Sequence, residues 1–297
     1  MKLADLHCDT PYELYHKSQS AITNGLHISI DKALYLEKYI QVASIWSNHK
    51  LSSDACMTDF IQISNDFKNK VGNLLCENKL NDHISFLLSV EDLRLIGNDP
   101  NKIYTLYKAG VKFATLTWKD ESLIGGAWNT DIGLSNYGYT VIDRLNEYRI
   151  IADISHGSHK LIEDVLAYNK RPVCATHSNA YSVHPHKRNL TDHHARSIAR
   201  SGGLIGACLC PTHISQSDPN ISDFADHIKH LVNIAGCDSV ALGSDFDGVA
   251  KLPEGIRDLT SAEYIFEAVA KQIGSKNAEK VFFDNVFNFL NANILGQ

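Results

Sequence analysis

The sequence contains no apolar run that approaches the roughly 20 residues needed to cross a bilayer. It also lacks an excess of positive charge, because 28 Lys and Arg residues against 34 Asp and Glu residues give a net charge of −6. This charge gives no reason to expect nucleic acid or an anionic membrane surface as a partner. The first residues, MKLADLHCDT, carry one lysine followed by further charged residues, which is not the pattern of a secretory signal. We therefore expect a cytoplasmic protein.

The seven cysteines include no CxxC pair, and their odd number does not suit a disulfide framework. Cysteines of this kind are typically small buried apolar residues in a reducing compartment. The composition, with 44% hydrophobic and 21% charged residues, is usual for a folded globular protein. A (β/α)₈ barrel needs about 250 residues, so one barrel would occupy nearly all of the 297 residues.

Short β-rich apolar segments alternate with amphipathic segments, which is the pattern of βα units and a parallel sheet. Eight strands are predicted, at 3–8, 38–45, 84–90, 111–117, 149–155, 172–176, 203–209 and 238–244. Helical periodicity is found at 54–79, 137–148, 191–201, 221–235 and 261–273, and an apolar helix is expected at 276–294. Because no repeat or linker interrupts this alternation, we predict an α/β fold with a single TIM-like (β/α)₈ barrel domain over residues 1–297.

Residues that bind metals or transfer protons stand at the ends of five predicted strands. They are His7 and Asp9 at the end of the first strand, Glu91 at the end of the third, His156 at the end of the fifth, His177 at the end of the sixth and Asp245 at the end of the eighth. Long segments at 118–135, 178–190 and 246–259 also follow strands, and in a barrel such loops lie on the C-terminal face, where active sites are found. Each residue alone is more often structural, but their repetition at the same end of several strands predicts a metal site.

The number of candidate ligands bears on the number of metals. Histidine, aspartate and glutamate side chains suit Zn²⁺. Five candidate ligands exceed the three protein ligands typical of one catalytic zinc, so two metals are predicted. Glu91 is alone on its strand and central among the ligands, which makes it the expected bridging carboxylate.

The chain resembles the membrane (renal) dipeptidase family of zinc peptidases, within the amidohydrolase-like barrels. The resemblance spans nearly the whole length and is carried by DLHCDT at 5–10, SVED at 89–92, DISH at 153–156, ATHSNAYSVHPHKRN at 175–189, ALGSDFDGV at 241–249 with LPEG at 252–255, and DNVFNFL at 284–290. The stretch from His177 to Asn189 and the SDFDG block are the most specific. The resemblance implies a metallo-dipeptidase with two Zn²⁺ per chain.

The resemblance also implies a role for each matching residue. One zinc would be held by His7, Asp9 and Glu91, and the other by Glu91, His156 and His177. Asp245 would act as the general acid/base beside the bridging Glu91. Arg188 would bind the C-terminal carboxylate of a dipeptide, for which a planar guanidinium is well shaped. Tolerance of a D-residue at the C-terminal position is a further implication.

Two positions depart from the family pattern. Trp118 stands where some relatives place a histidine near the reacting carbonyl, and Cys210 stands where members commonly present a tyrosine. Both are expected to contact substrate and to affect substrate choice.

Several neighbouring residues are expected to support the site rather than form it. Asp5 and Asp153 lie inside strands and are expected to hydrogen-bond the ligand histidines. Asp247 is expected to support its loop, and His159 to be exposed. His184 and His186 are expected at the rim of the substrate pocket.

Two other functions remain open from the sequence. Another amidohydrolase-type reaction, such as hydrolysis of a lactone, an N-acyl amino acid or a cyclic amide, would use the same barrel, and Arg188 suits any substrate with a free carboxylate. A binding or scaffold protein that keeps a metal site without catalysis is the third interpretation. A small dipeptide is the expected partner, and a homodimer is compatible with the sequence.

Overall fold

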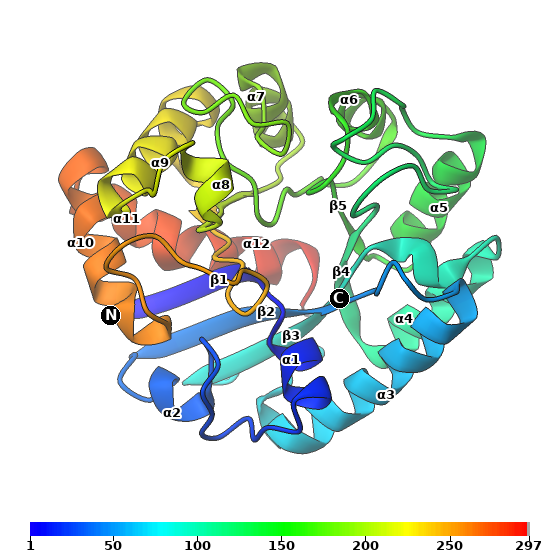
Figure 1. The fold of residues 1–297 in the computed structure, drawn as a ribbon, viewed down its shortest axis with the longest axis horizontal. Coiled ribbons are helices and arrows are strands. Elements are labelled where there is room, and N and C mark those ends of the chain that lie inside the picture. Colours follow the sequence, from blue (N-terminus) through cyan, green and yellow to red (C-terminus); the bar gives the residue numbers. More distant parts are fainter. Residues whose placement is uncertain (296–297) are drawn as a thin grey trace.

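A curved parallel sheet forms the centre of the computed structural model, which describes residues 1–295, and helices surround it (Figure 1). Within these residues the sheet has seven strands in the order β5-β4-β3-β2-β1-β7-β6. They are β1 (Lys2–Cys8), β2 (Lys38–Trp46), β3 (Ile84–Glu91), β4 (Val111–Thr115), β5 (Ile151–Asp153), β6 (Ile205–Ala207) and β7 (Val240–Leu242). The predicted α/β fold with a parallel sheet is confirmed.

The three longest strands form the most regular part of the sheet. β2 pairs with β3 residue for residue from Tyr39–Ile84 to Trp46–Glu91, and every residue of β3 is buried. These strands are buried on both faces because helices cover one face and the C-terminal segment covers the other. Since all strand pairs are parallel, the carboxyl ends of the strands meet at one edge of the sheet.

The predicted strand at 172–176 differs from the expectation. It forms only isolated parallel bridges, Asp153–Cys174 to β5 and Ala175–Ile205 to β6. The ladder is short because the Thr176 N–H donates to the Asp153 carboxylate, 2.9 Å away, instead of to a strand carbonyl. Segment 172–176 thus lies between the two edge strands of the sheet. The predicted strands at 149–155, 203–209 and 238–244 are likewise shorter than expected.

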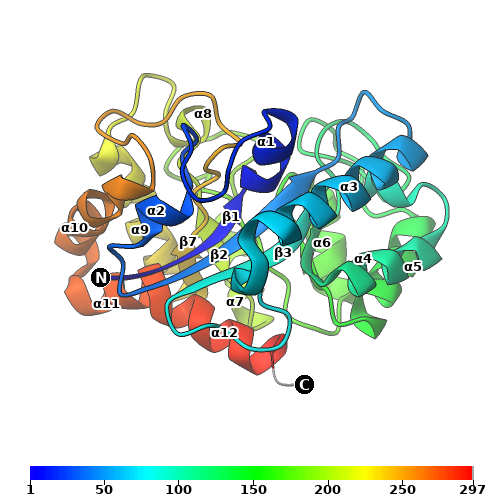
Figure 2. The ribbon, with the colours of Figure 1, turned by 90° about the horizontal axis from the view of Figure 1, so that it is seen from below.

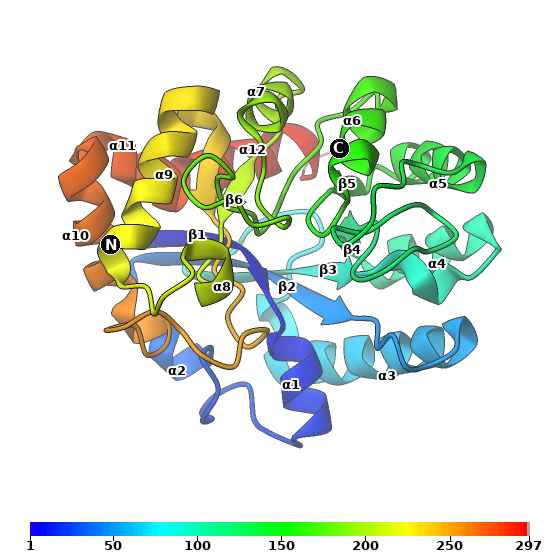
Figure 3. The same ribbon diagram turned by 45° about the horizontal axis from the view of Figure 1, so that its top comes forward.

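Helices follow the strands and pack around the outside of the sheet, as Figure 3 shows. They are α1 (Thr10–His16), α2 (Ile30–Ala33), α3 (Ser53–Val71), α4 (Ile103–Ala109), α5 (Asn136–Glu147), α6 (His159–Tyr168), α7 (Asp192–Arg200), α8 (Pro211–Ile214), α9 (Ile221–Ala235), α10 (Ala262–Ile273), α11 (Ser275–Glu279) and α12 (Asn285–Asn293). The helix predicted at 54–79 ends early, at Val71, because Gly72 adopts a φ of 55°. The helix predicted at 276–294 is divided by a π-helical segment, Lys280–Asp284.

The core has two parts, one on each face of the sheet. The larger part packs the sheet against the surrounding helices. The smaller part fills the inner face with side chains spaced two residues apart, such as Ala4 and Leu6 on β1, and Ile40 and Val42 on β2. Phe283 and other residues of the C-terminal segment cover this inner layer. Figure 2 shows α12 on the side of the sheet opposite α1 and α8.

The cysteines behave as expected from the sequence. All seven are free, and five of them are buried: Cys8, Cys56, Cys76, Cys174 and Cys208. Among residues 1–295, none of the helices combines the length and apolar character that a membrane span requires.

Candidate metal centre and substrate pocket

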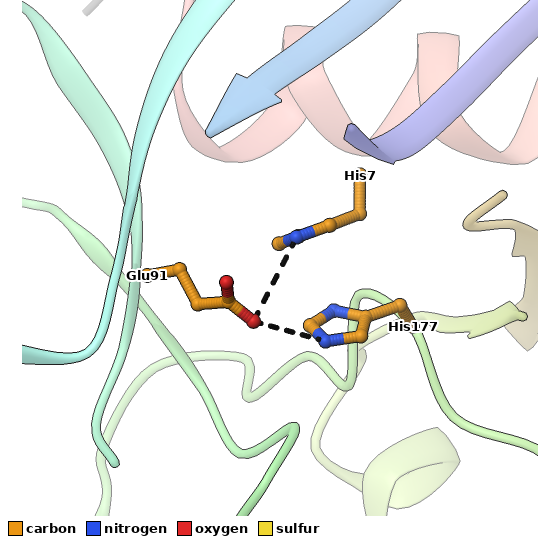
Figure 4. Close-up of side chains that lie close together, drawn as sticks. All are labelled: His7, Glu91 and His177. Atoms are coloured by element: carbon orange, nitrogen blue, oxygen red, sulfur yellow. Dashed lines mark ion pairs between the residues drawn. The ribbon is translucent and has the colours of Figure 1, made fainter. Parts of the chain in front are cut away.

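His7, Glu91 and His177 come from distant parts of the sequence and converge at the carboxyl edge of the sheet, where their side chains point toward one another (Figure 4). The Oε1 atom of Glu91 lies 3.9 Å from Nε2 of His7 and 3.3 Å from Nε2 of His177. All three residues are buried. A carboxylate that is removed from water in this way requires cationic or hydrogen-bonding partners.

His156 completes the group around Glu91. Its Nε2 atom lies 2.9 Å from Oε1 of Glu91 and 2.9 Å from Nε2 of His177. The backbone of His156 has a φ of 68°, a conformation that is rare for residues other than glycine. Such local strain is common at functional sites, where surrounding contacts hold it in place.

Asp9 and Asp245 form a second group with His7. One ligand atom from each of these three residues lies within 4.8 Å of the others. Gly248 lies against both acids, and a Cβ atom at this position would come within 2.1 Å of Asp9 Oδ2 and 2.5 Å of Asp245 Oδ1. The cradle that holds the two carboxylates therefore has no room for a side chain at Gly248.

The other ring nitrogens of these histidines have partners that fix their protons. Nδ1 of His156 lies 3.0 Å from the carbonyl oxygen of Trp118, which can only accept a hydrogen bond. Nδ1 of His7 and Nδ1 of His177 lie 3.2 Å and 2.9 Å from the Thr176 hydroxyl oxygen, which donates its own proton to Asp153 over 2.7 Å. Each Nδ1 atom therefore carries the proton, and each Nε2 atom presents a lone pair.

This donor set fits metal cations. The Nε2 lone pairs of His156 and His177 face each other at 2.9 Å, an arrangement that a cation between them would stabilise. Buried Nε2 of His7 and Oδ1 of Asp9 have no hydrogen-bond partner among the described residues. Unprotonated imidazole and carboxylate groups are the ligands that zinc prefers.

The electrostatics of the centre follow from its burial. Burial opposes ionisation of Glu91, but His156, His177 and His7 hold the pKa of this carboxyl well below its usual range. Burial lowers the pKa of His7 to about 3 and that of His156 and His177 to about 4, so the imidazoles are neutral at pH 7. Burial, together with the charge of Glu91, raises the pKa of Asp9 well above its usual range.

Asp245 follows β7 in a left-handed conformation with a φ of 63°. Its N–H donates to the His7 carbonyl over 3.1 Å, which ties it to the end of β1. Burial, with a contribution from Glu91, raises the pKa of Asp245 to about 7. The thiol of Cys208 lies 3.6 Å from Oδ2 of this carboxyl.

Arg188 is a buried cation, with 5% of its surface exposed. Its NH2 group donates to the carbonyl oxygen of His177 over 3.3 Å, and its buried Nε atom has no hydrogen-bond partner among the described residues. Within residues 1–295 no carboxylate lies within ion-pair distance of the guanidinium. A buried guanidinium without such a partner is able to receive an anionic group.

A cavity of about 210 Å³ opens beside the metal centre. It is lined by Asp9, Tyr12, Glu13, Trp46, Glu91, Trp118, Asp247 and Gly248. The rings of Trp46 and Trp118 meet edge to face with centroids 5.0 Å apart, and Tyr12 packs on Trp46 at 5.3 Å. Cys210 lies outside the group of described residues that line this cavity, at the N-terminal end of α8.

The structure corrects two expectations about supporting residues and refines a third. Asp5 hydrogen-bonds a ligand histidine as expected, but it accepts from the backbone N–H of His7, and from Ser244, rather than from the imidazole. Asp153 reaches the ligand histidines only through Thr176, which has no distinguishing sequence pattern. His159 is half-buried, and its Nε2 atom lies 3.2 Å from the Asn189 carbonyl oxygen.

Asp247 agrees with its expected role in supporting a loop, whereas the place of His184 and His186 at the rim of the substrate pocket stays a prediction, since neither lines the described cavity. Asp247 joins two loops, because its carboxylate accepts from the Thr10 hydroxyl and the His27 N–H, each over 2.6 Å. The rings of His184 and His186 are stacked with centroids 6.2 Å apart in the segment that carries Arg188.

Comparison with known sequences gives a consistent result. The family model described as membrane dipeptidase (peptidase family M19) matches residues 1–293. The chain is 31% identical over 210 residues to an uncharacterised dipeptidase from Schizosaccharomyces pombe, covering 67% of this chain and 50% of that protein. It is 30% identical over 212 residues to the dipeptidase tcpJ from Claviceps purpurea, covering 69% and 50%. The chain thus spans about half the length of these curated relatives.

Solved structures show the same fold. A family M19 metallopeptidase described as dipeptidase AC superposes with a TM-score of 0.89 at 21% identity, covering 99% of both chains. A metallopeptidase from Rhodobacter sphaeroides, bound to a phosphinate mimic of the dipeptide L-Ala-D-Ala, has a TM-score of 0.87 at 20% identity, again covering 99% of both chains. At these identities the likeness concerns the fold.

Proposed function

The chain belongs to the membrane dipeptidase family of peptidases, and on that premise we propose that it hydrolyses dipeptides with a free C-terminal carboxylate, using two zinc ions. The main support is the combination of a buried carboxylate surrounded by three neutral imidazoles and a buried guanidinium that has no carboxylate partner among the described residues. The carboxylate with its imidazoles suits metal ions, and the guanidinium suits the C-terminal carboxylate of a small substrate.

His7, Asp9 and Glu91 would hold one zinc ion, and Glu91, His156 and His177 the other. The shared Glu91 is supported by its Oε1 atom, which lies between 2.9 Å and 3.9 Å from all three imidazole Nε2 atoms. When bound, the two ions would supply an activated water molecule and polarise the scissile carbonyl.

Asp245 would act as the general acid/base. It takes a proton from the attacking water molecule and delivers it to the departing amine. A carboxyl whose pKa lies at about 7 is matched to this task at neutral pH, because it exchanges a proton readily in both directions. Its position close to Asp9 and His7 supports this role.

Arg188 would bind the C-terminal carboxylate of the substrate. Its burial favours this role, because a guanidinium removed from water gains strongly from a charged partner. Cys210, at the N-terminal end of α8, would contact the C-terminal residue of the substrate. Trp118, with Trp46 and Tyr12, would receive the N-terminal residue in the cavity.

Further parts of the proposal concern the fold and the substrate. We propose that segment 172–176 closes the sheet into an eight-stranded barrel, because it bridges both edge strands. The L-Ala-D-Ala mimic bound by the similar Rhodobacter sphaeroides enzyme supports acceptance of a D-residue at the C-terminal position. A cytoplasmic location and a homodimer remain predictions from the sequence.

The decisive experiment measures turnover of L,L- and L,D-dipeptides and of their C-terminal amides, before and after chelation, together with the zinc content of the protein. The proposal expects about two zinc ions per chain, loss of activity on chelation, recovery with zinc, and a strong preference for the free carboxylate. Equal turnover of the amides would instead favour another amidohydrolase-type reaction. A metal-loaded protein that turns over none of these compounds would favour a binding function.

A further inference from the structure

The Thr176 hydroxyl occupies an unusual position, because it contacts the neighbouring His177, the distant His7 of β1 and one buried carboxylate. Its oxygen lies 3.2 Å from Nδ1 of His7, 2.9 Å from Nδ1 of His177 and 2.7 Å from Oδ2 of Asp153. All four residues are buried. A hydroxyl group has one proton and two lone pairs, so these three contacts use its full capacity.

The direction of each hydrogen bond follows from the surroundings of Asp153. This carboxylate accepts from four donors: the Thr115 and Thr176 hydroxyls, at 2.6 Å and 2.7 Å, and the Ser155 and Thr176 N–H groups, at 3.0 Å and 2.9 Å. Because Asp153 is an acceptor, the Thr176 proton points to it. Both lone pairs of the oxygen are then left for the Nδ1–H groups of His7 and His177. The hydroxyl oxygen of Ser155 lies 3.5 Å from the hydroxyl oxygen of Thr176, at the outer limit of a hydrogen bond.

The backbone holds this hydroxyl rigidly. The Thr176 N–H is bound to Asp153, and the Thr176 carbonyl oxygen packs directly on two glycines. A Cβ atom at Gly206 would lie 2.0 Å from that oxygen, and one at Gly243 would lie 1.8 Å from it. The β-branched side chain of threonine further restricts rotation of the hydroxyl.

We propose that Thr176 is a positioning residue that fixes the proton on Nδ1 of both His7 and His177 and thereby orients the Nε2 lone pairs at both proposed metal positions. The inference rests on the proposed function, in which His7 belongs to one zinc position and His177 to the other. Their rings lie with centroids 3.8 Å apart, linked through a single oxygen atom. Loss of that oxygen should therefore weaken both positions together. His156 should be unaffected, because its Nδ1–H is held by the Trp118 carbonyl.

The first test needs no metal and no substrate. Two-dimensional ¹⁵N–¹H spectra of the histidine rings in the chelated wild-type protein should show the proton on Nδ1 of His7, His156 and His177. In Thr176→Val, the His7 and His177 signals should shift toward mixed protonation of Nδ1 and Nε2, while the His156 signal stays unchanged. A wild-type spectrum with the proton on Nε2 of His7 or His177 overturns the inference, even if the valine variant does not fold.

The second test measures zinc affinity by competition with a chromophoric chelator. Removal of a group that orients a metal ligand typically lowers affinity about 10- to 100-fold, and we expect Thr176→Val to lose affinity at both positions by this amount. Thr176→Ser keeps the hydroxyl and should remain close to wild type. Thr115→Val is the matched control, because it removes another hydroxyl from Asp153 without a contact to either histidine.

The outcomes separate this inference from the proposed function. Wild-type protein without zinc affinity contradicts the proposed function, but the metal-free spectra still test Thr176. Zinc-binding wild-type protein with an equally tight Thr176→Val variant overturns the role of Thr176 and leaves the dipeptidase proposal standing. Equal losses of zinc affinity in Thr176→Val and Thr115→Val would assign the effect to Asp153. That result would also overturn the positioning role of Thr176.

Discussion

Nε2 of His156 and Nε2 of His177 lie 2.9 Å apart, and both atoms present lone pairs rather than protons. Two lone pairs in contact repel each other, and burial keeps water from separating them. The same pair faces Oε1 of Glu91. We therefore expect a bound cation to stabilise this group of lone pairs and carboxylate oxygens.

Metal removal should lower the stability of the protein. A ligand present at about 100 times its dissociation constant stabilises the folded state by about 2.7 kcal/mol, so zinc should raise the Tm of the chelated protein by several degrees. In Glu91→Gln the carboxylate proposed to bridge the two ions is replaced by an amide, so the rise in Tm on addition of zinc should largely disappear. Thermal unfolding with and without zinc measures this effect. Identical unfolding curves for the wild type would contradict the proposed metal centre.

Replacement of Arg188 should act on substrate binding. A hydrogen bond to a charged group contributes about 1.5–3 kcal/mol, so Arg188→Met should lower kcat/KM for dipeptides about 10- to 100-fold, mainly through KM. Turnover of dipeptide amides should change little. Arg196→Met is the control, because Arg196 is half-exposed at the surface and pairs with Asp192. An equal loss of activity toward dipeptides and toward their amides in Arg188→Met would contradict the proposed contact between Arg188 and the substrate carboxylate.

Asp245→Asn should separate metal binding from turnover. The amide keeps the size of the side chain but transfers no proton, so kcat should fall about 10²- to 10⁴-fold while zinc content is retained. Steady-state kinetics and metal analysis of the same preparation measure both quantities. Full activity in this variant would remove Asp245 from the reaction.

The same variant should change how the metal-free protein responds to pH. The pKa of Asp245 is raised from 3.8 to about 7 in the folded state by burial and by Glu91. The folded protein therefore binds this proton more tightly, and the associated stability is fully present below pH 3.8 and is lost as the pH rises through 7.

An asparagine side chain is not titratable, so the variant should lack this pH-dependent loss. The free energy of unfolding of Asp245→Asn, relative to wild type, should rise by up to about 4 kcal/mol between pH 4 and pH 8, since one unit of pKa shift corresponds to about 1.4 kcal/mol. Urea unfolding of both chelated proteins at several pH values measures this difference in free energy of unfolding. The exposed Asp131→Asn is the control. If the difference in free energy of unfolding between Asp245→Asn and wild type stayed constant across this pH range, the folded state would not raise the pKa of Asp245.

A methyl group at Gly248 should disrupt the candidate metal centre around Asp9 and Asp245. In Gly248→Ala, the Cβ atom would approach Asp9 Oδ2 and Asp245 Oδ1 to within 2.1 Å and 2.5 Å, so both carboxylates must move. We expect zinc content and turnover to fall while circular dichroism shows a folded protein. Gly25→Ala is the control, because nothing lies within 4 Å of its added Cβ. Unchanged zinc affinity in Gly248→Ala would contradict the position assigned to Asp9.

The sequence predicts the parts of the site that depend on strand direction. Parallel strands end at one edge, so residues at their carboxyl ends, such as His7, Glu91 and His177, are expected to meet, and in the structure they do. The strand predicted at 84–90 matches β3 closely because apolar residues alternate along it at Ile84, Phe86, Leu88 and Val90, as expected for a strand with one face in the core. The resemblance to the membrane dipeptidase family is confirmed by the family model.

Other features depend on contacts that leave no pattern in the sequence. The carbonyl of Trp118 orients His156 through a backbone atom, which any residue would supply. Segment 172–176 fails to form a full ladder because a side chain, Asp153, captures a backbone N–H. Helical periodicity alone predicts a continuous helix at 276–294, whereas the structure has a π-helical segment at Lys280–Asp284, from which Phe283 packs into the inner layer of the sheet.

The C-terminal segment that covers the inner layer of the sheet has a consequence for catalysis. Phe283, Val286 and Phe289 pack into this inner layer, with Phe283 beside Lys2 at the amino-terminal end of β1. We therefore expect small molecules to reach the candidate metal centre from the carboxyl end of the strands. In the proposed reaction, a dipeptide and the two amino acids released from it would share that entrance, and product that has not yet left would compete with the next substrate.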